Sequence, residues 1–233
     1  MNESSFTLRV LLDRGSFLEE VRSGRELAQK SVALLGSSTA MFAIYGALMG
    51  AYYGPWQALS SAIKLPLLFL VTAAICFPTL YILSAFFGAK TSVGQYVAIV
   101  LAALAVSGMV LIAFAPITAF FLMTSADYPF FKLINVAVLG LSSFLGVKSL
   151  YRQVLDLSPA DDPTAKPRRR LLTFWVVLFA FVGSQLGWTL RPFFGAPGMR
   201  FEIVRELGGN FYLDIMRSLR EMVTFPDESP SQS

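Results

Sequence analysis

Tyr96–Thr124 reads YVAIVLAALAVSGMVLIAFAPITAFFLMT, and this stretch decides the fold class of the chain. It contains no Asp, Glu, Lys or Arg, and a helix needs roughly 20 apolar residues to cross the hydrocarbon core of a bilayer. Because lipid cannot hydrogen-bond to an exposed backbone, such a stretch is expected to be helical. Pro116 interrupts it. We therefore expect one long, kinked helix, with two half-spans as the alternative.

Further apolar runs on both sides of this stretch are each near or above the length of one crossing. They cover residues 31–53, 65–88, 133–150 and 171–190. The hydrophobic fraction of 55% and the mean hydropathy of +0.61 are far above those of soluble domains. The sequence therefore predicts an all-α integral membrane protein, a bundle of five transmembrane helices over residues 31–190, with the lipid bilayer as its surroundings.

The two ends of the chain are expected to carry amphipathic helices at the membrane interface. Residues 1–30 form a cytoplasmic segment with a helix from Ser16, lying on the membrane surface or on the bundle. The apolar side of this helix comprises Phe17, Leu18, Val21 and Ala28. Residues 191–224 form an outer interfacial cap with an amphipathic helix, and residues 225–233 a disordered tail.

The basic residues predict the orientation of the bundle. They gather before the first run and after the fourth, where residues 152–170 read as a mobile cytoplasmic loop. Since cytoplasmic segments are enriched in Lys and Arg, we expect a bacterial cytoplasmic (inner) membrane protein with its N-terminus inside and its C-terminus outside. Tryptophans at the ends of the runs are expected at headgroup level, namely Trp56, Trp175 and Trp188.

Small residues four apart allow two membrane helices to approach closely, and such steps occur in the first and fifth runs. Gln185 is expected to seek a hydrogen-bond partner on another helix. The predicted positions for helix packing or partner contact are Gly46, Gly50, Gly54, Gly183, Gln185 and Gly187. The predicted interfacial cap is anchored by Trp188, Arg191, Phe193 and Asn210, of which Asn210 can cap the final helix.

The residue types that the chain lacks limit the chemistry it can perform. Histidine is absent and Cys76 is the one cysteine, so the chain alone cannot build a Cys/His zinc site or a His-based catalytic triad. We expect no catalytic residue, no metal and no cofactor. The excess of basic residues is explained by membrane topology, so no nucleic-acid partner is expected. No acid or base lies near the middle of a run, which disfavours an ion-coupled transporter but leaves open an oligomeric pore lined by hydroxyls.

Two short patterns resemble known membrane proteins. The segments Lys64–Leu68 and Cys76-Phe77-Pro78, together with Ala115-Pro116, resemble bacterial Yip1-like proteins. The segment Ser184–Phe193 resembles a string in uncharacterised bacterial polytopic proteins. The first resemblance implies a five-span bundle with a cytoplasmic N-terminus and a role in membrane trafficking or organisation, although the long N-terminal domain of the eukaryotic members is missing.

We therefore expect a non-enzymatic inner-membrane protein that acts by association, as a scaffold or an accessory subunit of a membrane complex. Its partner would be another protein in the membrane or further copies of the same chain. The alternative is a channel or transporter subunit.

Overall fold

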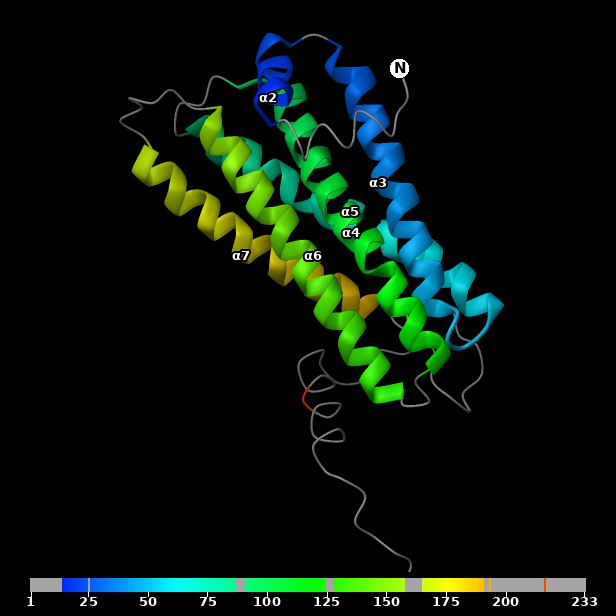
Figure 1. Cartoon of the computed structure of the whole chain (residues 1–233). Helices are drawn as coiled ribbons and strands as arrows, with labels where there is room; N and C mark the ends of the chain where they lie inside the picture. The colour runs from blue at the N-terminus through cyan, green and yellow to red at the C-terminus, as the bar shows by residue number, and fades with distance from the viewer. Residues whose placement is uncertain are drawn as a thin grey trace, which may run out of the picture.

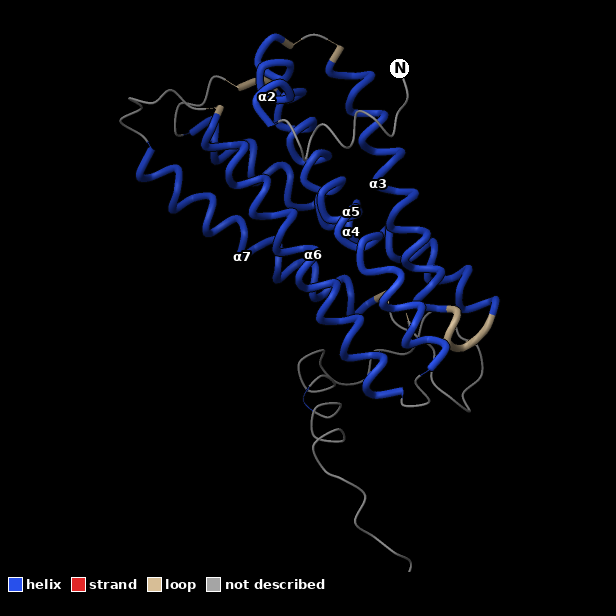
Figure 2. Tube along the Cα trace, viewed as in Figure 1, coloured by secondary structure: helices blue, strands red, loops and turns tan. Residues whose placement is uncertain are grey.

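The structure is a computed structural model that describes residues 14–24, 26–86, 91–124, 128–157, 165–190, 193 and 216. Within these residues the chain forms helices and no strand (Figure 2). The helices are α2 (Arg14–Ser23), α3 (Leu27–Gly50), α4 (Pro55–Phe86), α5 (Val93–Thr124), α6 (Tyr128–Asp156) and α7 (Ala165–Thr189). The last five are long and apolar enough to cross a membrane. The predicted fold class of five apolar spans is confirmed.

Several helices extend beyond the apolar runs that predicted them. The largest difference is α4, which starts at Pro55, so that most of the expected connection before residue 65 is helical. Proline is well suited to the first position of a helix, where its missing N–H would have no partner. The loop expected over residues 152–170 is likewise shorter than predicted, because α6 continues to Asp156 and α7 begins at Ala165.

The helix α5 forms the centre of the bundle. It runs without interruption through Pro116, so the interpretation as one helix is correct and the two half-spans are excluded. Its most apolar window is 61% buried, against 33% or less for the other spans. The small residues Ala102, Ala103 and Ala105 lie against its neighbours and allow this close packing.

Successive helices of the bundle run in alternating directions (Figure 1). The contacts place α3 between α4 and α5, with α6 on the other side of α5 and α7 on the outer side of α4. The helices α6 and α7 barely touch each other. We call the end of the bundle where α2 lies the α2 end, and the end with the turn at residues 51–54 the turn end.

The helix α2 packs on one end of the bundle. Phe17 and Val21 belong to the main hydrophobic core. Ser16 lies within α2 and therefore does not cap it, and Ala28 is exposed in α3 rather than sharing the apolar side of α2. The helical conformation is interrupted between α2 and α3, where Gly24 and Glu26 have positive φ angles.

Candidate functional site

Polar side chains gather inside the bundle near its turn end. The end of α3, the start of α4, the end of α5 and the start of α6 meet there (Figure 1). Six polar residues from these four helices are each at most 5% exposed: Tyr45, Gln57, Ser61, Lys64, Thr118 and Asn135. Polar groups at this depth need partners, because neither lipid nor an apolar core supplies any.

One part of this cluster is a hydrogen-bonded chain that joins three helices. The Tyr45 hydroxyl lies 3.0 Å from Thr118 Oγ1 and donates to Asn135 Oδ1 at 2.9 Å. Asn135 Nδ2 in turn donates to the carbonyl oxygen of Phe131 at 2.8 Å. With Tyr45 donating to Asn135, the Thr118 hydroxyl is the donor to Tyr45. The chain therefore connects α3, α5 and α6 through consecutive donors and acceptors.

A second part of the cluster lies along one side of α4. Gln57 Nε2 donates to Ser61 Oγ at 3.3 Å, and Ser61 Oγ donates to the carbonyl oxygen of Phe193. Phe193, which was predicted to anchor the outer cap, therefore contacts the start of α4 just after α7 ends. Arg191 and Asn210, two further predicted anchors, lie outside the described residues.

Lys64 is the residue that sequence reasoning missed. The apolar pattern starts the second run at residue 65, so the sequence predicts Lys64 in the connection before it. In the structure it lies inside α4, about 14 Å along the axis from Pro55 at the usual rise per residue, and is 5% exposed. A periodic signal was present, since Gln57, Ser61 and Lys64 fall on one side of a helix. Only an assignment of helix to residues 55–64 would have revealed it.

The glycines of the first span differ in their surroundings. A Cβ atom at Gly46 would lie 2.9 Å from the carbonyl carbon of Ser61, and one at Gly50 would lie 2.7 Å from that of Gln57. Both glycines therefore allow the backbones of α3 and α4 to approach closely. Gly54 does not take part, because it lies in the turn with a φ of 147° and open space around it.

The glycines of the fifth span also lie towards α4 but at ordinary contact distances. A Cβ atom at Gly183 would lie 3.5 Å from Thr72 Cγ2, and one at Gly187 would lie 4.0 Å from Leu68 Cδ1. Gln185 is exposed on the outer side of α7 rather than facing another helix of this chain. Trp188 is half-buried near the end of α7.

Trp175 is buried inside the bundle. It is 1% exposed, and its indole Nε1 donates to the carbonyl oxygen of Cys76 at 2.8 Å. Its ring lies 5.3 Å from that of Phe179. Trp175 thus attaches α7 to the middle of α4.

A small cavity of about 20 Å³ lies beside this tryptophan, between α4, α5, α6 and α7. Its lining includes Phe69, Ala103, Ser107, Gly146, Trp175 and Phe179. On the α6 side, Ser107 Oγ donates to the carbonyl oxygen of Ser142 at 3.1 Å. The volume is that of about one water molecule, so the space is a packing gap where α6 and α7 diverge.

The described residues contain no group of three or more His, Cys, Asp or Glu side chains that could hold a metal ion. The polar cluster at the turn end offers hydroxyl and amide groups and the ammonium group of Lys64. Comparison with protein-family models, curated proteins and solved structures finds no significant match.

Proposed function

We propose that this chain is a non-enzymatic, multi-pass protein of the bacterial inner membrane that acts as a scaffold or accessory subunit of a membrane complex. The observation that carries the proposal is the use of polar side chains at membrane depth. Tyr45 bonds to Asn135, Ser107 to Ser142 and Trp175 to Cys76, each time between two different helices. Such bonds hold helices in one arrangement, as a platform for other proteins requires.

The resemblance to Yip1-like proteins is consistent with this role in membrane organisation. Its residues lie in two spans, with Cys76-Phe77-Pro78 inside α4 and Ala115-Pro116 inside α5. We propose the Yip1-like family as a working assignment. We further propose that the partner is either a different membrane protein or a further copy of this chain.

The proposed orientation places the α2 end in the cytoplasm. Exposed basic side chains at this end include those of Arg22, Arg152 and Arg169, and cytoplasmic ends of membrane proteins are rich in such residues. Cysteine introduced at Glu19 on α2 should resist a membrane-impermeant maleimide in whole cells with a permeabilised outer barrier, whereas cysteine at Ala51 in the turn should react. The reverse pattern would show that the orientation is inverted.

Affinity purification of the tagged full-length chain in mild detergent, followed by mass spectrometry, tests the association. We expect a partner, or copies of this chain, in a fixed stoichiometry. A second sample carrying Gly50→Ile serves as the control with a disrupted bundle, because the isoleucine side chain cannot fit between α3 and α4. Recovery of a wild-type monomer alone, with the bundle intact, would contradict the proposal.

The alternative, a channel or transporter subunit, is favoured by one observation, the burial of Lys64 within a spanning helix. Ionisable residues at membrane depth often mark a substrate or ion pathway. Reconstitution into liposomes distinguishes the two functions. If the chain moves ions, Lys64→Met should abolish the flux, whereas Lys132→Met near the start of α6 should retain it. Absence of flux from the wild-type chain would favour the scaffold.

A further inference from the structure

The helix α2 is held on the bundle by a small set of contacts. Phe17 and Val21 are 3% and 1% exposed, whereas Glu19 and Arg22 on the same helix are exposed. Gln95, near the start of α5, donates through Nε2 to the carbonyl oxygen of Val21 at 2.8 Å. The buried apolar side chains of α2, which also include Leu18, and the hydrogen bond from the Gln95 side chain thus hold the centre of α2 over the start of α5.

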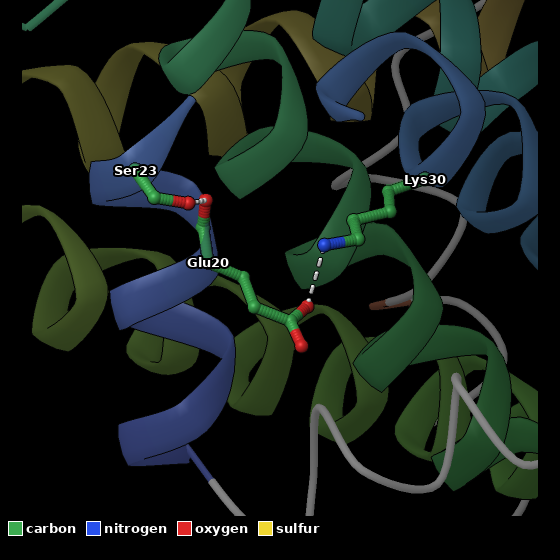
Figure 3. Close-up of polar contacts among 3 residues, drawn as sticks. All are labelled: Glu20, Ser23 and Lys30. Carbon is green, nitrogen blue, oxygen red and sulfur yellow. Dashed lines mark hydrogen bonds and ion pairs between the residues drawn. The ribbon is translucent and has the colours of Figure 1, made fainter. Parts of the chain in front are cut away.

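Two cations complete the attachment, and both bind oxygen atoms. Arg22 donates through its guanidinium group to the carbonyl oxygen of Asp156, at the end of α6. The Lys30 ammonium, from the first turns of α3, lies 2.8 Å from Glu20 Oε2 (Figure 3). The Lys30 and Glu20 side chains are 16% and 40% exposed. Phosphate oxygens of a lipid headgroup could replace both acceptors, because they accept from the same donors.

The connection between α2 and α3 has the geometry of a hinge. Ser23 ends α2 and its hydroxyl donates to the carbonyl oxygen of Glu20 at 2.8 Å (Figure 3). Gly24 then has a φ of 70° and Glu26 a φ of 54°. A left-handed conformation is unfavourable for a residue other than glycine, and the exposed Glu26 side chain makes no capping hydrogen bond, so the backbone is locally strained at this position. Because α3 starts immediately afterwards, a change in the backbone angles at Gly24 or Glu26 would move α2 without disturbing α3.

The position of the hinge places both cations close to lipid. In a bundle that spans the membrane, the α2 end lies at headgroup level in either orientation. A helix with one apolar side and several charges can also lie in that interface. Each Lys or Arg near an anionic membrane surface raises the equilibrium constant for binding to that surface by about fivefold. Anionic lipid therefore competes with Asp156 and Glu20 for the same cations.

We propose that α2 is a hinged clasp that closes one end of the bundle and is released by anionic phospholipid headgroups. In the closed state Arg22 of α2 binds the end of α6, Lys30 of α3 binds Glu20 of α2, and the apolar side of α2 is buried. In the open state the two cations bind headgroup phosphates, and the apolar side of α2 enters the interface. Release of α2 requires only that the bundle is inserted in a membrane, and does not depend on whether the chain acts as a scaffold.

Thiol accessibility in lipid nanodiscs tests the clasp with the full-length chain. Val21→Cys reports on release, Phe17→Cys is a second reporter, and Glu19→Cys is the control on the exposed side of the same helix. The native Cys76, buried in α4, reports on unfolding of the whole bundle. Labelling rates with a maleimide are compared by mass spectrometry in nanodiscs of phosphatidylcholine and in nanodiscs containing phosphatidylglycerol.

We expect Val21→Cys and Phe17→Cys to label slowly in phosphatidylcholine and at least fivefold faster in the anionic nanodiscs, with Cys76 unlabelled in both. High salt should remove the difference, because it shortens the range of the surface potential. The combined change Arg22→Gln and Lys30→Gln should give fast labelling of Val21→Cys in both lipids. Equal slow labelling of the two reporters in both lipids would overturn the proposal, as would labelling of Cys76 in step with them.

Discussion

Replacement of Gly50 by alanine tests the packing of α3 on α4 most directly. The added Cβ atom would lie 2.7 Å from the carbonyl carbon of Gln57 and 2.8 Å from the Cα atom of Ala58, and closer still to the Gln57 carbonyl oxygen. These are backbone atoms of a helix, so they cannot rotate away as a side chain could. Relief requires α3 and α4 to separate locally by about 0.7 Å, which removes a quarter to a half of the dispersion energy of each affected contact.

We therefore expect Gly50→Ala to lower the free energy of unfolding by about 2 kcal/mol, as overpacking does in other tightly packed cores. The matched control is Gly36→Ala in the same helix, because a Cβ atom there would meet nothing within 4 Å. It should leave stability unchanged or slightly raised, since alanine favours a helix over glycine.

The assay can use the native Cys76, which is buried and becomes reactive when the bundle opens. A thiol-reactive fluorophore in mild detergent then reports the melting temperature of each variant. Gly50→Ala should melt below the wild type, and Gly36→Ala with it or above it. If the two variants melt together, the close approach of α3 and α4 at Gly50 is refuted.

Three further predictions concern the other helix contacts. Tyr45→Phe should lower the free energy of unfolding by about 1 to 2 kcal/mol, because it leaves the Asn135 amide oxygen without its donor. In the same melting assay, Tyr45→Phe combined with Asn135→Leu should lower stability by less than the sum of the two single changes. Trp175→Phe should cost about 1 kcal/mol by removing the bond to the Cys76 carbonyl, and limited proteolysis should then cut α7 before the other spans; unchanged proteolysis would contradict this anchor. Gly146→Ala should cost about 1 to 3 kcal/mol, because its Cβ atom would lie 2.8 Å from a backbone carbonyl oxygen of α5, and an unchanged melting temperature would argue against that contact.

The number and type of the spans could be predicted because the requirement is local. Each backbone N–H and C=O must be paired within its own segment when lipid surrounds it, so the apolar run at residues 96–124 was sufficient to predict α5. The start of α4 could not be predicted in this way. Gln57 and Lys64 interrupt the apolar pattern, and only their burial against other parts of the chain makes a helix from Pro55 compatible with the membrane.

The candidate site was predicted only in part for a similar reason. The spacing of Gly46 and Gly50 indicated a flat side on α3, but did not reveal that α4 of the same chain covers it. Trp175 is buried between helices of the bundle, whereas Gln185, which was expected to contact another helix, is exposed on the surface of α7. Which side of α7 meets α4 depends on how the two surfaces fit, and the composition of α7 alone contains no information about α4.

The amino-acid sequence by itself determined that this is a helical membrane protein with five apolar spans, because hydrocarbon length and backbone pairing leave no other solution for such runs. The tertiary structure decided which polar groups are paired at depth, as in the chain from Thr118 through Tyr45 to Asn135. It also decided that α2 packs over α5 and that Lys64 is buried. These features depend on contacts between residues far apart in the chain, so they arise only once the helices have packed together in their final arrangement.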